Sequence, residues 1–398
     1  MAVSAGPLSG TVVVDLSRAL AGPHAGMMLG DLGARVVKVE SPGHGDDTRG
    51  WGPPFVAADW PATGPADGVS TYFLSCNRNK ESIALDLKSD EGRDVLTALV
   101  ERADVLVENF RTGVLDRLGF TTERLLELNP RLVVLSITGF GHDGPEGGRA
   151  GYDQIAQGEA GLMSVTGSGP EDPQRVGVPI ADLLAGMWGG YGVLAALLER
   201  ERTGRGQVVR TSLLAGVVGI HAFQGTRQTV AGETGLAQGN HHPSIAPYGL
   251  FRCKDGAVQI AVGSEGLWQR FCAAFDLDPH ADGMATNPQR AANRHAVIDV
   301  VEAAFAPYAS ADLLGRLATA GIPAGRVRTL DEVYAWDQVR SQGLLVDVDH
   351  AVLGPVTLPG PPLRFFDGSG AETTRTAHSA PPILDGDRES VLAWLDRA

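Results

Sequence analysis

Short runs of β-branched residues alternate with helical patterns along the first 140 residues of the chain. The runs TVVVDL at 11–16, RVVKVE at 35–40 and DVLVE at 104–108 have the composition of buried strands. Helices are predicted between them at 21–32, which is rich in glycine and alanine, and at 91–102, where apolar residues recur on one face. The same pattern predicts further strands at 83–87 and 132–137 and a helix at 122–128. Repeated β-α-β units predict an α/β fold with a mostly parallel, Rossmann-like sheet covered by helices.

The rest of the chain is predicted to add a long helix, a second domain and a return to the first. The helix is expected at 182–201, with Asp182 as its N-cap, and is followed by a strand at 207–211 and one helix at 213–230. A Gly-, His- and Pro-rich break follows at 232–247. After it we expect a hairpin at 248–262 around Lys254-Asp255-Gly256 and helices at 267–275, 293–306 and 311–320. Extended segments are expected from Gly325, and a last helix at 388–397. We therefore expect a large domain built from 1–225 and 330–398, and a smaller α+β domain at 235–325.

Charge and cysteine spacing narrow the class of protein. The net charge of −14 disfavours nucleic acid as a partner, because phosphate binding normally needs a basic face. The three cysteines lie far apart and indicate neither a disulfide framework nor a zinc site. Adjacent His241 and His242 would point apart in an extended loop, so no metal is expected there. The N-terminus lacks a signal-peptide pattern and the apolar run 181–198 is interrupted by Asp182 and glycines, so we expect a cytoplasmic protein with no membrane partner.

A dinucleotide-binding site is the obvious alternative for a chain that begins with β-α-β units. The glycines after the first strand are Gly22, Gly26, Gly30 and Gly33, which do not spell G-x-G-x-x-G. Glu40 ends the second strand where a ribose could bind, but the phosphate-binding turn is missing. No Walker A sequence and no G-x-S-x-G elbow occurs either. NAD and FAD are therefore not expected as cofactors.

Several ordered blocks of the chain resemble the class III CoA-transferases, the family of formyl-CoA:oxalate and carnitine CoA-transferases that also contains α-methylacyl-CoA racemase. The blocks include DLSRALAGPHAGMMLGDLGARVVKVE from Asp15, NRNKESIALDLKSDEG from Asn77, ADVLVENFRTGVLDRLGF from Ala103, GYDQIAQGEAGLMSVTG from Gly151, GVPIADLLAGMWGGYG from Gly177 and GIPAGRV from Gly321. They cover nearly the whole chain. The segment GNHHPSIAPYGLF from Gly239 is most similar to the succinyl-CoA and mesaconyl-CoA branch, whose members act on dicarboxylates.

The resemblance implies a catalytic aspartate, which falls on Asp182, 29 residues after Asp153. Asp182 would attack the donor thioester, and the reaction would pass through mixed anhydrides and an aspartyl-CoA thioester. Thioester is exchanged for thioester, so neither ATP nor metal is required, and coenzyme A or acyl-CoA is bound as substrate rather than as a permanent cofactor. With a reference pKa of about 3.9, Asp182 is expected to be ionised at neutral pH. Asp153 matches an acid that lines the family's site and is given a supporting polar role, although on sequence alone it could be a satisfied, partly buried acid.

The resemblance also implies which residues bind the two substrates. The CoA-contacting positions fall on Arg18, Lys38, Asn109, Phe110, Arg117 and Leu118, each of which could otherwise be an ordinary surface or packing residue. The substrate pocket is expected to include Leu20, Trp51, Tyr152, His241, His242 and Ser244. The three small-domain residues among these could equally belong to a structured inter-domain loop. Family members form an interlocked homodimer, with each site between the large domain of one chain and the small domain of the other.

Two other functions remain compatible with the sequence. The first is an α-methylacyl-CoA racemase-like isomerase, against which Tyr152 counts, because it stands where the racemases carry a basic histidine. The second is a non-catalytic acyl-CoA-binding protein with the same fold. Leu20 replaces a glutamine of the formyl-CoA enzyme and argues against oxalate as a substrate. The favoured prediction is an acyl-CoA:carboxylate CoA-transferase that acts on a small dicarboxylate.

Overall fold

The computed structural model describes residues 5–57 and 68–397 as two compact units. The large unit comprises the chain up to Leu162, Val176–Thr229, and the chain from Asp337 onward. The small unit comprises Met163–Arg175 and Val230–Trp336. It extends beyond the predicted 235–325, because the backbone N–H groups of Ala237 and Gly239 donate to the carbonyls of Ser164 and Gly167 at 3.1 and 2.9 Å.

The centre of the large unit is a six-stranded sheet in which every neighbouring pair of strands is parallel, as predicted. In spatial order the strands are β5 (Lys80–Ala84), β2 (Arg35–Glu40), β1 (Val12–Asp15), β6 (Val105–Glu108), β7 (Val133–Thr138) and β8 (Val208–Ser212). Strand β5 begins three residues earlier than the predicted 83–87. The sheet is buried because its strands are runs of valine, leucine and isoleucine whose side chains face helices on both sides.

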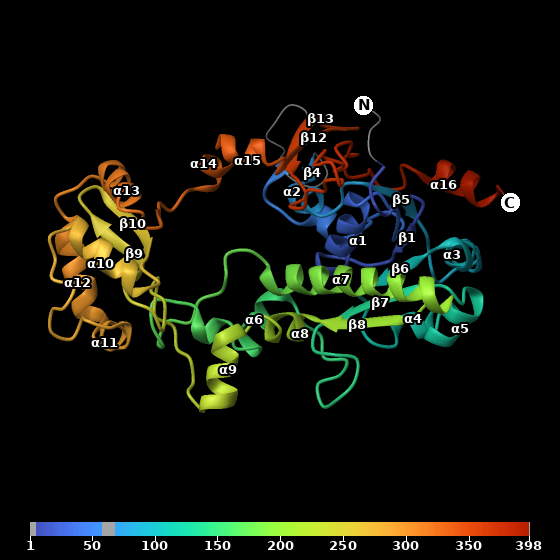
Figure 1. Ribbon diagram of the computed structural model, residues 1–398. Helices are drawn as coiled ribbons and strands as arrows, with labels where there is room; N and C mark the ends of the chain where they lie inside the picture. The colour runs from blue at the N-terminus through green and yellow to red at the C-terminus, as the bar shows by residue number, and fades with distance from the viewer. Residues whose placement is uncertain (1–4, 58–67, 398) are drawn as a thin grey trace. The chain divides into compact units, whose positions relative to one another are not determined.

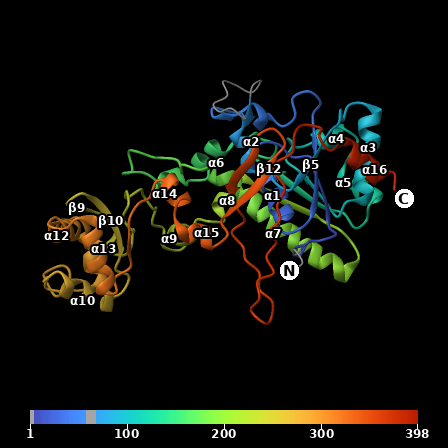
Figure 2. The same ribbon diagram turned by 90° about the horizontal axis from the view of Figure 1, so that it is seen from above.

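Helices cover both faces of this sheet (Figures 1 and 2). On one face α1 (Ala21–Asp31) and α7 (Ile180–Thr203) pack over Val13, Leu135 and Ile137. On the other face α3 (Asp90–Arg102), α5 (Thr122–Leu128) and the C-terminal α16 (Arg388–Leu395) pack around a core that includes Val14, Leu106 and Val134. Alternate residues of one strand therefore belong to different cores, as the period of a β-strand requires.

Helix α7 begins two residues earlier than the sequence predicted. Its N-cap is Pro179, so Asp182 is the third residue of the helix rather than its cap. The cap hydrogen bond comes instead from a distant side chain, because Asp153 accepts the N–H of Ala181. The helix ends at Gly204, whose positive φ of 71° suits a residue without a side chain.

Two other expectations for the large unit need correction. The helix predicted at 213–230 is split into α8 (Leu213–Val218) and α9 (Ala222–Ala231), and Ala222 at the break has a φ of +47°. The C-terminal extended region contains an antiparallel hairpin of β12 (Leu345–His350) and β13 (Gly354–Pro359). The remaining elements of the large unit are the 3-10 turn η1 (Asp47–Gly50), the strands β3 (Phe55–Val56) and β4 (Val69–Ser70), and the helices α2 (Thr71–Ser75), α4 (Val114–Arg117), α6 (Asp153–Glu159) and α15 (Asp337–Ser341). The 3-10 turn η2 (Met163–Val165) and α14 (Leu330–Tyr334) belong to the small unit.

The small unit has the predicted α+β composition. The hairpin pairs β9 (Tyr248–Cys253) with β10 (Gly256–Ala261), and β11 (Ala324–Gly325) completes an antiparallel sheet. The predicted helices are present as α10 (Glu265–Ala274), α12 (Arg294–Phe305) and α13 (Ser310–Thr319), together with the short α11 (Asn287–Ala292). Their apolar residues form a separate core around Phe251, Trp268 and Phe271.

Candidate active site

Two acidic side chains are joined through the backbone at the start of α7. Asp153 opens α6, at the N-terminal end of α7 (Figure 1), and one of its oxygens accepts the N–H of Ala181 at 2.8 Å. Its other oxygen accepts from Nε2 of Gln157 at 2.8 Å, and Oε1 of this buried glutamine accepts the N–H of Val176 at 2.9 Å. Asp153 therefore ties α6 to the helix that carries Asp182, which is a more specific role than the supporting one predicted.

Asp182 is half-buried beside this acid. Burial and then the negative charge of Asp153 raise the pKa of Asp182 to about 7, well above the reference value of 3.8. The expectation that Asp182 is fully ionised at neutral pH is therefore corrected. A carboxylate that few water molecules solvate is a better nucleophile than one in bulk water, and it also loses its proton less readily.

Tyr72 is a residue of this site that the sequence did not indicate. It lies in α2, whose N-cap Ser70 accepts the N–H of Tyr72 at 3.1 Å. Burial, followed by the charges of Asp182, Cys76 and Asp153, raises the pKa of the Tyr72 phenol to about 12, which places the phenol near both acids. Trp51, a predicted pocket residue, packs edge-on against the Tyr72 ring with 5.0 Å between ring centres. The phenol stays protonated at neutral pH and can donate a hydrogen bond.

The N-terminus of α1 meets α7 one turn beyond Asp182. A Cβ atom on Gly186 would lie 2.6 Å from the carbonyl oxygen of Ala21, so only glycine permits this approach. Leu20, another predicted pocket residue, is the buried N-cap of α1, and no side chain caps the helix. The amide groups of this helix end are therefore left for another hydrogen-bond acceptor.

The loop that leads into α1 is fixed by buried polar side chains. Lys38 was predicted to contact CoA, but its side chain is fully buried, paired with Asp46 at 2.9 Å and donating to the carbonyl of Ser17 at 2.9 Å. It therefore positions the loop and is not available to a ligand at the surface. Although burial opposes ionisation, Asp15 and Asp46 raise the pKa of Lys38 above its usual value. Asp46 also accepts the N–H of Ala19, whose φ is +62°.

Three of the other predicted CoA-contacting residues meet at this loop. The side-chain amide of Asn109 brackets Arg18 by accepting its N–H at 2.8 Å and donating to its carbonyl at 2.7 Å. The guanidinium of Arg18 donates to the Ser41 hydroxyl at 3.1 Å and lies 5.6 Å from the centre of the Phe110 ring. Arg117, at the end of α4, is exposed, and the next residue, Leu118, is partly buried.

The remaining predicted pocket residues belong to the N-cap of α6, next to Asp153, and to the small unit. Tyr152 is 69% exposed. His241, His242 and Ser244 belong to the small unit, where the His242 ring stacks on Tyr248 at 5.1 Å and the N–H of Ser244 donates to Nδ1 of His242 at 3.1 Å. Burial and the nearby Arg294 lower the pKa of both histidines. Across residues 5–57 and 68–397, no group of three or more His, Cys, Asp or Glu side chains could hold a metal ion.

Comparison with known proteins identifies the class to which this fold and site belong. The sequence model of CoA-transferase family III matches residues 8–388, so the chain belongs to that family and the enzyme is a CoA-transferase. The resemblance stated from the sequence blocks is confirmed.

Individual relatives match over most of their length. A succinate–glutarate CoA-transferase of Agrobacterium fabrum is 39% identical over 90% of this chain and 91% of its own. A succinyl-CoA:mesaconate CoA-transferase of Haloarcula hispanica is 36% identical over 97% of this chain and 96% of its own. The crystal structure of a CAIB/BAIF family protein from Brucella suis is 38% identical, covers 98% of this chain and 100% of its own, and superposes with a TM-score of 0.84.

Helix α7 is both long and apolar. Among the described residues, α7 alone has the length and apolar composition to cross a bilayer, and half of the relevant window is buried inside the protein. A long core helix passes the same test, and α7 packs against α1 and β7.

Proposed function

We propose that this CoA-transferase moves CoA from succinyl-CoA to a small dicarboxylate, with Asp182 as the nucleophile. The observation that carries the mechanism is the half-buried carboxyl of Asp182, whose pKa is raised to about 7 beside Asp153. Such a group is poorly solvated and ready for acyl transfer. The substrate class is supported by the relatives from Agrobacterium fabrum and Haloarcula hispanica, which are named for succinate with glutarate and for succinyl-CoA with mesaconate.

The proposed reaction has four covalent steps that balance without ATP or metal. The Asp182 carboxylate attacks the thioester carbon, the C–S bond breaks, and a mixed anhydride and CoA thiolate form. The thiolate attacks the Asp182 carbonyl, which releases succinate and leaves an aspartyl-CoA thioester. The acceptor carboxylate then attacks this thioester, giving a second anhydride, and the thiolate finally attacks the acceptor acyl carbon and frees Asp182.

The large unit offers donors for the oxyanions that arise in these steps. We assign this role to the Tyr72 phenol and to the uncapped amide groups at the start of α1. For CoA we assign Arg18, Phe110, Arg117 and Leu118 as contacting residues, with Asn109 and Lys38 holding the loop. Trp51, Leu20 and Tyr152 are assigned to the acyl pocket. We propose no permanently bound cofactor.

We further propose an interlocked homodimer, in which His241, His242 and Ser244 of a partner subunit complete the site. Exposed apolar residues along α7 support a partner chain, because Met187, Trp188, Tyr191 and Leu198 are each more than 40% exposed. Light scattering on the eluted protein should give twice the chain mass. The protein is proposed to be cytoplasmic and to have neither nucleic acid nor membrane as a partner.

Oxygen exchange tests the proposed nucleophile directly. The enzyme would be turned over with succinyl-CoA and glutarate labelled with ¹⁸O in its carboxylates, and the peptide containing Asp182 would be weighed by mass spectrometry. Labelled oxygen should accumulate in Asp182, because its carbon–oxygen bonds are made and broken in each cycle. No label should appear at position 182 of Asp182→Asn. The control Asp299→Asn changes an exposed carboxylate on α12 and should incorporate label in Asp182 as the unaltered enzyme does.

Two outcomes would contradict the proposal. Transfer of CoA without label in Asp182 would exclude the aspartyl intermediate. Exchange of the α-proton of a 2-methylacyl-CoA for deuterium, with no acceptor acid present, would favour the racemase-like alternative.

A further inference from the structure

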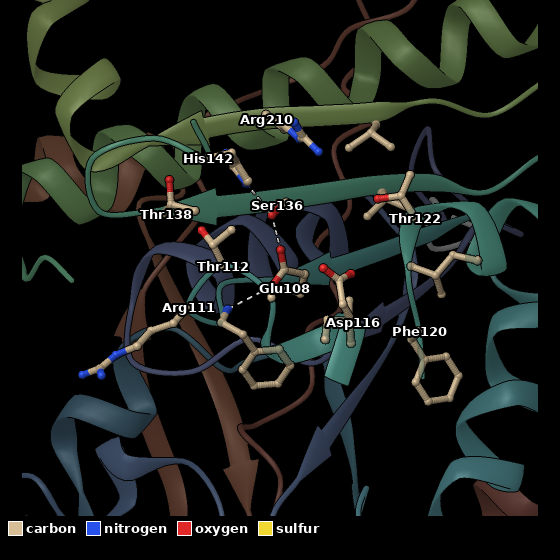
Figure 3. A pocket seen from close by; sticks show the side chains of 16 residues that line it. Glu108, Arg111, Thr112, Asp116, Phe120, Thr122, Ser136, Thr138, His142 and Arg210 are labelled. Carbon is tan, nitrogen blue, oxygen red and sulfur yellow. Dashed lines mark hydrogen bonds between the residues drawn. The ribbon is translucent and has the colours of Figure 1, made fainter. Parts of the chain in front are cut away.

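A pocket lies on the face of the sheet opposite α7, along β7 and β8 and at the end of β6 (Figure 3). Its empty volume, including the open mouth, is about 570 Å³. Leu135 and Ile137 of β7 face α7, whereas Ser136 and Thr138 line the pocket. The sheet therefore separates this pocket from Asp182, and Phe110 is the one residue assigned above to CoA that also lines it.

The floor of the pocket is a chain of hydrogen bonds centred on a buried carboxyl. Glu108, at the end of β6, accepts the Ser136 hydroxyl through Oε1 and the N–H of Phe110 through Oε2 at 2.9 Å. Nε2 of His142 lies 2.7 Å from the same hydroxyl. Both oxygens of Glu108 are thus engaged by the protein itself, and burial raises the pKa of Glu108, which favours its neutral form.

The opposite wall carries a guanidinium without a partner. Arg210 lies directly across from Ser136 in the register of β7 and β8, and Figure 3 shows it on the same side as His142, facing Glu108 and Asp116. Arg210 is exposed, and in the described part of the chain its side chain makes no hydrogen bond or ion pair. Burial and then the charge of Arg210 lower the pKa of His142, which places the cation close to the imidazole.

We infer that this pocket is a binding site for a small oxyanion, a carboxylate or a phosphate, held by the guanidinium of Arg210. The planar fork of arginine matches two oxygens of such a group, and an arginine with no partner in the protein is free to bind it. The hydroxyls of Thr112 and Thr122 line the same pocket and can donate to the remaining oxygens. The nearest unneutralised acid, Asp116, is exposed, so water screens its repulsion.

The hydrogen-bonded chain of Glu108, Ser136 and His142 predicts that the protein takes up a proton when the anion binds. The Ser136 hydroxyl has a single proton, which it donates to Glu108 while that carboxyl is ionised. An anion bound beside this chain favours the protonated forms of both Glu108 and His142. The charged groups around the imidazole are Glu108 on β6, Asp116 on α4, Asp143 in its own loop and Arg210 on β8. Anion affinity should therefore rise as the pH falls.

Calorimetry on the full chain tests this site apart from the CoA chemistry. The protein, saturated with CoA to occupy the acyl-CoA site, would be titrated with sodium phosphate and separately with sodium acetate. At least one anion should bind in a 1:1 ratio, and which one binds distinguishes phosphate from carboxylate. Arg210→Gln should weaken binding about 10- to 100-fold, because it removes charge-assisted hydrogen bonds.

Matched variants make the outcome decisive. Arg124→Gln removes the same charge from the exposed face of the adjacent α5 and should bind the anion as the unaltered protein does. Arg210→Lys keeps the positive charge but lacks the planar guanidinium, so its anion affinity should lie between those of the unaltered protein and Arg210→Gln. This variant tests the site if Arg210→Gln does not fold. Absence of binding in both titrations, or equal loss in Arg124→Gln and Arg210→Gln, would overturn the inference.

Discussion

The carboxylate of Asp153 accepts the backbone N–H of Ala181 and so caps helix α7. The residue that follows Ala181 in this helix is the second acid, Asp182. A helix N-terminus stabilises a negative charge, but two carboxylates at the same terminus repel each other. Burial, and then the charge of Asp153, nevertheless raise the pKa of Asp182 to about 7. Asp153 is itself held by hydrogen bonds to Ala181 and Gln157.

The pH dependence of turnover should reflect this pair. Only the ionised form of Asp182 is a nucleophile, so kcat/KM should fall as the pH drops below about 7. Asp153→Asn removes the neighbouring charge and should move this acidic limb to lower pH, because less repulsion opposes ionisation of Asp182. The measurement is the pH profile of kcat/KM for succinyl-CoA with glutarate in excess.

Glu159→Gln provides the control for that experiment. It removes one negative charge from the far end of α6, where Glu159 is exposed and paired with Arg149 at 2.6 Å. Its pH profile should match that of the unaltered enzyme. If both variants moved the limb equally, net charge rather than the contact at Asp182 would explain the shift.

The free energy of unfolding should fall with rising pH, whereas kcat/KM should rise. Folding raises the pKa of Asp182 from 3.8 to about 7. Below about pH 4 the carboxyl is protonated and its burial does not reduce the stability of the folded protein, whereas stability is lost as the pH rises through the folded pKa of about 7. Asp182→Asn should therefore stabilise the protein at about pH 8, by up to about 4 kcal/mol, and have little effect at about pH 4. Urea unfolding at both pH values measures the difference, and an equal effect at the two would contradict the raised pKa.

The sheet was predictable because its strands are β-branched runs separated by periodic helices, a pattern that depends only on neighbours in sequence. The start of α7 was not, because its cap comes from Asp153, which is far along the chain. The site residues divide in the same way. Asp153 and Asp182 stand in family-like blocks, whereas the place of Tyr72 and the burial of Lys38 are set by tertiary packing. No local pattern separates a buried lysine from one that meets a ligand.

Replacement of Lys38 should reveal its positioning role. Lys38→Met leaves Asp46 buried without its cation and should cost about 3–5 kcal/mol of stability. Arg35→Met, three residues earlier on β2, breaks the partly exposed pair with Glu81 and removes the guanidinium from the Trp394 ring, 4.3 Å away, and should cost about 1–2 kcal/mol. Adding Asp46→Asn to Lys38→Met should restore part of the loss, because the uncompensated charge is then gone. Thermal unfolding of the four proteins tests this order, and equal losses in the two single variants would contradict it.

The close contact of α1 with α7 gives a steric prediction at Gly186. In Gly186→Ala the new methyl would lie 2.6 Å from the carbonyl oxygen of Ala21, so the start of α1 must move away from the turn that carries Asp182. Gly190→Ala is the matched control, one turn further on, where the nearest atom would be Cε of Met28 at 3.8 Å. Alanine favours a helix over glycine by up to about 1 kcal/mol, so the control should be neutral or slightly stabilised. Gly186→Ala should instead lose stability and most of kcat, because the amide groups at the start of α1 are displaced from the acyl group. Comparison of kcat and melting temperature for the two variants decides the matter, since equal kcat values would show that the contact at Gly186 does not position the site.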